Sequence, residues 1–145
     1  MIAIGCDHGG IHHKEQIEKK LTEWGYELKD FGTYDESSCD YPDIAFKVAS
    51  AVAEGSCDRG ILICGTGIGM SIAANKVKGI RAAHVCDTFS ARMAREHNNA
   101  QIICLGERIT GIEVALEIVK TYLNSEFAGG RHEKRVSKIT EIENR

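Results

Sequence analysis

The stretch GILICGTGIGMSIAANK, residues 60–76, is the clearest indication of the fold class. An apolar run ends at Cys64, a glycine-rich loop follows, and apolar residues at helical spacing begin near Gly69. A short run that is apolar at nearly every position is typical of a strand buried on both faces, as in parallel sheets. The stretch therefore predicts a strand, a tight loop and a helix, which together make one β-α unit.

The same order of strand and helix recurs along the chain. Strands are expected over 2–6, 27–31, 60–64, 80–86 and 101–105, and helices over 11–24, 43–54, 69–76, 89–96 and 112–123. Five such units predict a doubly wound, Rossmann-like α/β fold in which helices cover both faces of a five-stranded parallel sheet. The 145 residues, 43% of them hydrophobic, suffice for one core, so residues 1–145 are expected to form a single domain.

Residues 132–144 predict a further helix, because Val136, Ile139 and Ile142 follow at three-residue steps after the break at Gly129–Gly130. No strand is expected after it. A C-terminal helix outside the β-α alternation often packs on a neighbouring subunit, so we expect a homodimer or a dimer of dimers.

Charge and composition argue against several classes of partner. The chain has 18 basic and 21 acidic residues, a net charge of -3, and no long block of one sign, so no nucleic acid or membrane partner is expected. No apolar run approaches the ~20 residues of a membrane span, and the first residues lack a secretory signal, which favours a cytoplasmic protein. The six cysteines form no Cys-x-x-Cys pair and are expected to be free thiols.

The loops after the first and third strands hold the residues most suited to chemistry. In open α/β sheets ligands bind beyond the carboxyl ends of the strands, where the strand order reverses. Asp7 and His8 follow the first strand, although Asp7 alone is equally suited to cap the next helix. Cys64 follows the third strand at a helix N-terminus, which stabilises a thiolate, and the glycines beyond it allow amides to hold an anion. The simpler alternative is that the glycine loop is only a tight turn, which packs the following helix against the sheet.

Two other groups of polar residues are candidates. His97 and Asn98 end the fourth expected helix, where they act either as acid–base groups or as a helix cap. Arg131 and Arg135 lie four residues apart on the expected helix, so both can hold one phosphate. A charged run such as residues 131–135 is, however, more often a solvent-exposed helix face. No residues have the spacing of a metal site, and the glycine loop fits neither the dinucleotide nor the Walker pattern, since Met70 replaces the last small residue and no Gly-Lys-Ser/Thr follows.

Seven motifs together resemble the type B ribose-5-phosphate isomerases, a family that includes allose-6-phosphate isomerases. They are Gly5-Cys6-Asp7-His8, Asp40-Tyr41-Pro42, Cys64-Gly65-Thr66-Gly67-Ile68-Gly69, Ala73-Ala74-Asn75-Lys76, Arg95-Glu96-His97-Asn98, Gly106-x-Arg108 and Gly129-Gly130-Arg131-His132-x-x-Arg135. The resemblance implies an aldose–ketose isomerase that interconverts D-ribose 5-phosphate and D-ribulose 5-phosphate through an enediolate, in the non-oxidative branch of the pentose phosphate pathway. It implies no metal and no cofactor.

The resemblance also implies a role for each matching residue. Cys64 is the expected base, His97 assists ring opening, and Asp7 and Thr66 lie near the reacting oxygens. In another branch of the family the base is a Glu, where this chain has Met70. The expected substrate-binding positions are His8, Arg131 and Arg135 for phosphate, Arg108 from a neighbouring subunit, and Tyr41 and Asn98 for the sugar hydroxyls. The amides of Gly67, Ile68, Gly69 and Met70 are expected to hold the enediolate, and Gly65 is a further binding position in the same loop. His12 and His13 are interpreted as surface residues.

Two alternative functions remain open from the sequence. One is isomerisation of allose 6-phosphate, another hexose phosphate or a rare sugar, which needs the same chemistry and a different pocket length. The other is a non-catalytic α/β module that binds a nucleotide phosphate in the glycine loop.

Overall fold

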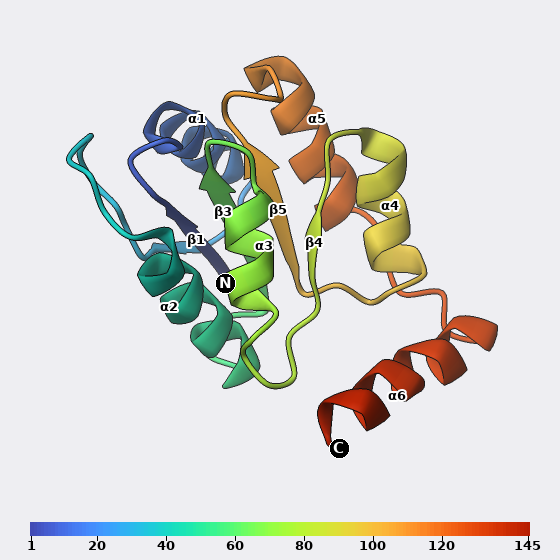
Figure 1. Cartoon of the computed structure of the whole chain (residues 1–145). Coiled ribbons are helices and arrows are strands. Elements are labelled where there is room, and N and C mark those ends of the chain that lie inside the picture. The colour runs from blue at the N-terminus through green and yellow to red at the C-terminus, as the bar shows by residue number, and fades with distance from the viewer.

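The computed structural model describes residues 1–145 and consists of one parallel sheet between two layers of helices (Figure 1). The strands are β1 (Ile2–Cys6), β2 (Leu28–Asp30), β3 (Arg59–Cys64), β4 (Ala82–His84) and β5 (Ile102–Gly106). The helices are α1 (Ile11–Glu23), α2 (Tyr41–Ala53), α3 (Ile68–Ala74), α4 (Thr88–Glu96), α5 (Ile112–Leu123) and α6 (Arg131–Glu143). The predicted α/β class, with five parallel strands, is confirmed.

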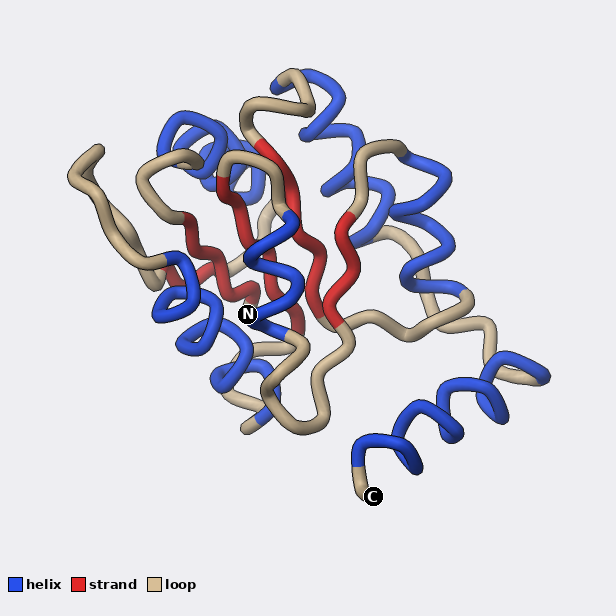
Figure 2. The backbone as a smooth tube through the Cα atoms, viewed as in Figure 1, coloured by secondary structure: helices blue, strands red, loops and turns tan.

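The order of the strands explains why ligands would bind at one edge of the sheet. The order is β2-β1-β3-β5-β4, and all neighbours are parallel. From β1 the chain goes first to β2 on one side and then to β3 on the other, so the winding reverses between β1 and β3. Figure 2 shows the loops after β1, β3 and β5 together at the upper end of the sheet.

Alternation along each strand divides the core between the two faces of the sheet. Ile61 and Ile63 pack toward α1, α4 and α5, whereas Leu62 and Cys64 pack toward α2 and α3. All four side chains are at most 5% exposed. The near-continuous apolar run in β3 is therefore explained by burial on both faces.

The boundaries of some elements differ from the expected ones. β4 is shorter than the predicted strand over 80–86, because Ile80 lies in a turn that bonds to Val77 and only three residues pair with β5. Ile80 and Val85 are nevertheless buried, so they are apolar because they pack in the core and not because they pair with β5. α2 starts two residues earlier than expected, since Pro42 is well suited to the first helical turn.

α6 lies beside the amino end of the sheet, away from the loops after β1 and β3 (Figure 1). The Ala128 amide donates to the Glu96 carbonyl at 2.9 Å, and the Gly79 amide donates to Glu143 Oε1 at 2.9 Å, so both ends of this segment are tied to the domain. Only Val136 of the helix is buried, and Ile142 is 65% exposed. The helix is present as expected, and most of its apolar face is uncovered in the single chain.

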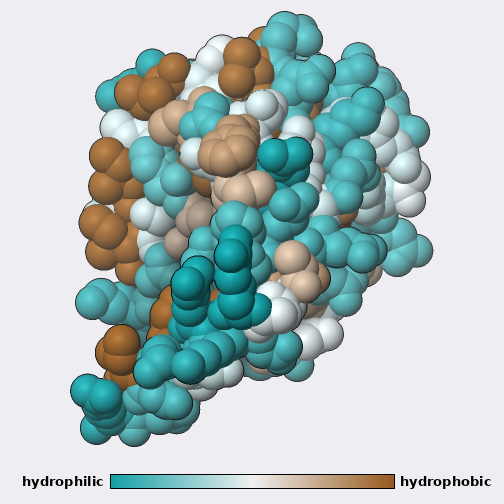
Figure 3. All heavy atoms as spheres, turned by 90° about the vertical axis from the view of Figure 1, so that its right-hand side faces the viewer, coloured by the Kyte–Doolittle hydropathy of each residue, from teal (hydrophilic) through white to brown (hydrophobic).

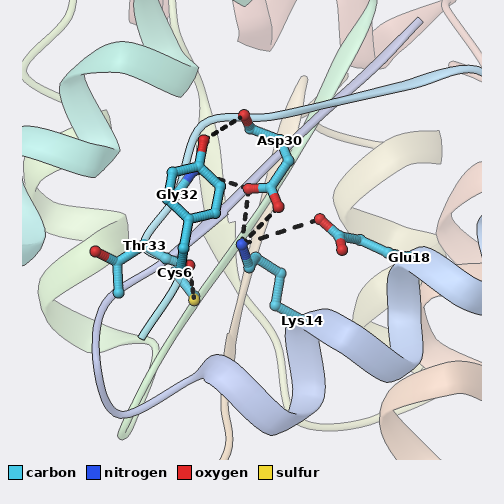
Figure 4. A network of polar contacts seen from close by, with 7 residues as sticks. Cys6, Lys14, Glu18, Asp30, Gly32 and Thr33 are labelled. Carbon is cyan, nitrogen blue, oxygen red and sulfur yellow. Dashed lines mark hydrogen bonds and ion pairs between the residues drawn. The ribbon is translucent and has the colours of Figure 1, made fainter. Parts of the chain in front are cut away.

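A partly buried ion pair joins α1 to β2 (Figure 4). Lys14 Nζ donates to both carboxylate oxygens of Asp30 at 2.7 Å, and the Gly32 amide donates to Asp30 Oδ1 at 2.8 Å. Glu18 is less well paired, because its Oε1 lies 4.0 Å from Lys14 Nζ and has no hydrogen-bond partner. Burial, and then a hydrogen bond with Asp30 and the negative charge of Asp30, raise the pKa of Glu18 to about 7.

We expect Glu18→Gln to raise the melting temperature by about 2–4 °C near pH 8, and by less near pH 5, because a partly screened charge is worth on the order of 1 kcal/mol. Between the ordinary glutamate pKa of 4.5 and the raised pKa of about 7, the folded state therefore holds a proton that the unfolded state has already lost. Stability from this group therefore falls as pH rises through that window. Glutamine mimics the protonated carboxyl and can still donate to Asp30.

The matched control is Glu54→Gln, which changes an exposed carboxylate that makes no ion pair. Thermal denaturation of both variants at the two pH values checks the prediction. An equal shift for Glu18→Gln at both values would mean that its carboxyl does not titrate in this window.

Candidate active site

The loops after β1 and β3 touch each other at the reversal point of the sheet. A Cβ added to Gly9 would lie 3.2 Å from the backbone nitrogen of Gly65, so the approach is close. A Cβ added to Gly106, at the end of β5, would lie 2.5 Å from the carbonyl carbon of Thr66. Glycine at these positions lets the backbone of the Cys64 loop pack between β1 and β5.

Cys64 ends β3, and its side chain is nearly enclosed beneath the loop. The residue is 5% exposed, and its Sγ accepts a hydrogen bond from the Gly67 amide at 3.1 Å. Gly67 has a φ of 83°, a left-handed conformation that favours glycine. A donated N–H stabilises a thiolate, so the loop suits Cys64 to act as a base.

The other cysteines that the sequence places at strand ends have different surroundings. Burial raises the pKa of Cys6 to about 12 and also raises that of Cys104, so both thiols stay protonated. Cys6 Sγ lies 3.8 Å from the Thr33 carbonyl, to which it donates, and Cys86 is exposed. Only Cys64 among these four accepts a backbone amide at its sulfur.

Two of the amides at the start of α3 donate to acceptors within the chain, and two have no partner. The Gly67 amide points at Cys64 Sγ, and the Ile68 amide donates to Thr66 Oγ1 at 3.2 Å. The amides of Gly69 and Met70 have no acceptor in the chain. Of the four amides predicted to hold the enediolate, these two are therefore free to do so. The Met70 side chain is fully buried in the core, so only its backbone can serve the site.

Asp7 is fixed beside this loop and caps no helix. Its residue is 7% exposed, and Oδ1 accepts a hydrogen bond from the Gly9 amide at 2.8 Å. α1 begins only at Ile11, after Gly10, with no side-chain hydrogen bond at its N-terminus. The helix-cap alternative for Asp7 is therefore wrong, and its second oxygen has no partner in the chain.

His8 and Tyr41 lie at the same end of the sheet. The Cys39 amide donates to His8 Nδ1 at 3.3 Å, so the ring proton sits on Nε2, which has no partner and can donate to an anion. Tyr41 opens α2, and its ring covers Gly69, where an added Cβ would lie 2.7 Å from the ring carbons. The loop over 33–40, which leads into Tyr41, thus borders the Cys64 loop.

Arg108 lies beside the Cys64 loop of its own chain. Its amide donates to the Gly65 carbonyl at 3.0 Å, and its side-chain Cδ lies 3.5 Å from a Cβ built on Gly65. The reason is the strand order, because β3 and β5 are neighbours and the turn after β5 meets the loop after β3. Arg108 therefore belongs with Cys64.

His13 is buried, so its interpretation as a surface residue is wrong. The residue is 8% exposed, its Nε2 lies 2.7 Å from the Thr110 carbonyl, and its amide donates to Glu107 Oε1 at 2.7 Å. These contacts anchor the turn that carries Arg108. The available signal was helical spacing, since His13 and Ile17 are four residues apart on the buried stripe of α1. His12 is exposed, as expected.

A second group of candidate residues gathers where α4 ends and α6 begins. The rings of His97 and His132 stack with centroids 4.0 Å apart and planes 13° apart. Arg131 and Arg135 make no ion pair, and Asn98 is exposed. Partial desolvation and the positive charges of His97, Arg131 and Arg135 lower the pKa of His132. The group carries several positive charges that no ion pair within the chain neutralises, which suits a phosphate.

The capping alternative for the residues after α4 is partly right. Asn99 has a φ of 48°, and the next amide, of Ala100, donates to the Ala94 carbonyl at 2.9 Å. This left-handed residue ends the helix. His97 and Asn98 keep side chains that the cap does not use.

The two groups lie at opposite ends of the sheet (Figure 1). Cys64 is at the carboxyl end of β3, whereas His97 precedes β5, whose first residue pairs with Gly60 at the amino end of β3. Four residues of strand separate these levels by about 13 Å. One chain therefore brings together Cys64, Asp7, Thr66, His8, Tyr41 and Arg108, and it holds His97, Asn98, Arg131 and Arg135 elsewhere.

The structure offers no cluster of three or more His, Cys, Asp or Glu side chains that could hold a metal ion. None of its helices combines the length and apolar character needed to span a membrane. All six cysteines are unpaired.

A doubly wound sheet with a buried thiol and free amides at its reversal point defines a small-molecule enzyme site of the α/β class. The family model described as Ribose/Galactose Isomerase matches residues 2–139, and the chain belongs to this family. The chain is thus a member of an isomerase family, in agreement with the resemblance seen in its motifs.

Several relatives match over nearly the full length. Ribose-5-phosphate isomerase B of Escherichia coli (strain K12) is 49% identical over 99% of this chain and 97% of its own. The structure of Clostridium thermocellum ribose-5-phosphate isomerase B superposes with a TM-score of 0.98 at 59% identity, covering 99% of this chain and 97% of that one. D-erythrulose-4-phosphate isomerase of Pectobacterium atrosepticum is 49% identical over 95% of this chain and 91% of its own.

Proposed function

We propose that the protein interconverts D-ribose 5-phosphate and D-ribulose 5-phosphate, with Cys64 as the base. The observation that carries this proposal is the buried Cys64 Sγ, which accepts the Gly67 amide beside the unpaired amides of Gly69 and Met70. Moving a proton next to a carbonyl needs a positioned base and a site for the developing oxyanion. The full-length relatives with ribose-5-phosphate isomerase names support this substrate over a hexose phosphate or a nucleotide.

The proposed chemistry follows from the position of each group. The Cys64 thiolate takes the proton from C2 of the open-chain aldose, which leaves an enediolate, and the resulting thiol returns the proton to C1. The amides of Gly69 and Met70 hold the negative oxygen. The free oxygen of Asp7 and the Thr66 hydroxyl lie beside the reacting oxygens and carry a proton from one to the other. Tyr41 borders the sugar hydroxyls.

We infer that each site is completed by a second copy of the chain. Ring opening is assigned to His97, a contact with the sugar hydroxyls to Asn98, and phosphate binding to Arg131 and Arg135. All four lie at the far end of the sheet from Cys64 in the same chain. In a two-fold dimer these residues of one copy would meet Cys64, His8 and Arg108 of the other, so the phosphate would lie between His8 Nε2 and the two arginines.

The exposed apolar residues support such a dimer. Phe46 on α2, Ile72 on α3 and Ile142 on α6 are each at least 58% exposed. Figure 3 looks onto the side that carries α4, α5 and α6, where most of the surface is hydrophilic and apolar side chains gather along the left edge. Burying α6 and the α2/α3 face against a second copy would cover them. A dimer, or a dimer of dimers, is therefore proposed, and the six free thiols fit the reducing cytoplasm.

The experiment that tests the substrate is a coupled assay of three sugar phosphates in the presence of a metal chelator. We expect kcat/KM on ribose 5-phosphate to exceed that on allose 6-phosphate and on erythrulose 4-phosphate by at least about 10-fold, since one carbon unit changes the fit in the pocket. Activity that persists with the chelator agrees with proton transfer by side chains alone. A higher kcat/KM on either other sugar would reassign the substrate, and ATP binding without any turnover would support the non-catalytic alternative.

A further inference from the structure

The peptide unit between Thr66 and Gly67 is held by a hydrogen bond at each end. On its amide side, the Gly67 N–H points at Cys64 Sγ at 3.1 Å. On its carbonyl side, the Thr66 oxygen lies 2.7 Å from Nε2 of His84, the last residue of β4. His84 is exposed and has no part in the chemistry assigned above, so this contact has no other evident purpose.

The contact fixes which ring nitrogen of His84 carries the proton. A carbonyl oxygen only accepts, so Nε2 must be the donor. Cys86 Sγ also lies near Nε2, but at 3.8 Å, so the Thr66 carbonyl is the principal acceptor. His84 thus donates to the same peptide unit that donates to Cys64.

The backbone alone does not fix the orientation of this peptide unit. Gly67 has a φ of 83°, and glycine adopts positive and negative φ with similar ease. A larger residue cannot lock the turn, because a Cβ on Gly67 would lie 2.8 Å from His84 Cδ2 and 2.9 Å from the Leu105 carbonyl carbon. The direction of the Gly67 amide therefore depends on the partners at the two ends of the peptide unit.

We propose that His84 is a positioning residue that aims the Gly67 amide at Cys64 Sγ and thereby stabilises the thiolate. Donation to the Thr66 carbonyl opposes a flip of the peptide unit and polarises it, which strengthens its N–H as a donor. The consequence for turnover rests on the proposed role of Cys64 as base. The effect on the thiolate does not depend on that role.

The test compares the alkylation rate of Cys64 by iodoacetamide at neutral pH among His84 variants of the full-length protein. Trypsin cuts after Arg59 and Lys76, so Cys64 is the only cysteine in its peptide, residues 60–76, and Cys86 is measured separately. His84→Phe keeps a ring but has no donor, and His84→Gln keeps a donor at the reach of Nε2. Ultraviolet thiolate absorbance, referenced to Cys64→Ser in each background, gives the same comparison without a reagent entering the site.

We expect the Cys64 thiolate signal of His84→Phe to fall about 3- to 10-fold, with His84→Gln within about twofold of the unchanged protein. We expect kcat on ribose 5-phosphate to fall by a similar factor in His84→Phe while KM stays nearly constant. The melting temperatures should remain close, because His84 is exposed. A merely structural role would change stability without changing the thiolate.

An unchanged thiolate signal in His84→Phe, or an equal loss in His84→Gln, would overturn the proposal whatever happens to turnover. A lower thiolate signal with unchanged kcat would uphold the role of His84 and instead contradict Cys64 as the base. The two proposals thus fail in distinguishable ways.

Discussion

Replacing Cys64 with alanine is expected to lower kcat on ribose 5-phosphate by about 10²- to 10⁴-fold, the usual contribution of a positioned acid–base group. The sulfur accepts a backbone N–H beside the free amides of Gly69 and Met70, and no carboxylate stands at position 70 to replace it. Sugar-phosphate binding should change little, because phosphate contacts are made equally in the ground and transition states. Steady-state kinetics and a binding titration with ribose 5-phosphate measure the two effects.

The matched control is Cys57→Ala. Cys57 is 2% exposed, similar to Cys64, and lies before β3 at the opposite end of the strand. The same atoms are removed from a buried position, so a loss of packing would affect both variants alike. We expect the control to retain kcat. Turnover by Cys64→Ala at a rate near that of Cys57→Ala would refute the base assignment.

The fold could be predicted from local sequence patterns because its decisive features are local. The run in β3 is apolar on both faces, and the glycine loop and helix that follow it form one continuous unit. The position of Asp7 and His8 next to Cys64 also follows from a general rule, since the first and third strands flank the reversal point. The predicted bounds are least accurate for β4, because apolar residues on either side of this strand are buried by packing and resemble strand residues in the sequence.

Other features of the site depend on contacts between distant segments. The sequence shows that Arg108 follows the fifth strand, but only the β3–β5 pairing shows that it meets Gly65 of its own chain. His84 looks like an ordinary strand residue until its ring is seen against the Thr66 carbonyl. The distance between His97 and Cys64 likewise depends on the register between β3 and β5, which the pattern of residues along the sequence does not specify.

The division of candidate residues between two ends of the sheet leads to the second large prediction. Cys64→Ala and His97→Ala should each be nearly inactive alone, because each removes an acid–base group from every site. If each site takes Cys64 from one copy and His97 from the other, a mixed dimer of the two variants contains one site with both residues intact. Its other site lacks both. Mixing two inactive proteins should then restore turnover.

This mixture tests whether one isomerase site is built from the Cys64 end of one chain and the His97 end of another. The two purified variants are dissociated, mixed in equal amounts and reassociated, and ribose 5-phosphate turnover is compared with the unchanged protein treated in the same way. Random pairing predicts recovery of about a quarter of the unchanged activity, since half of the dimers are mixed and each has one intact site. Mixed dimers that form but show no more turnover than the separate variants would contradict the shared site.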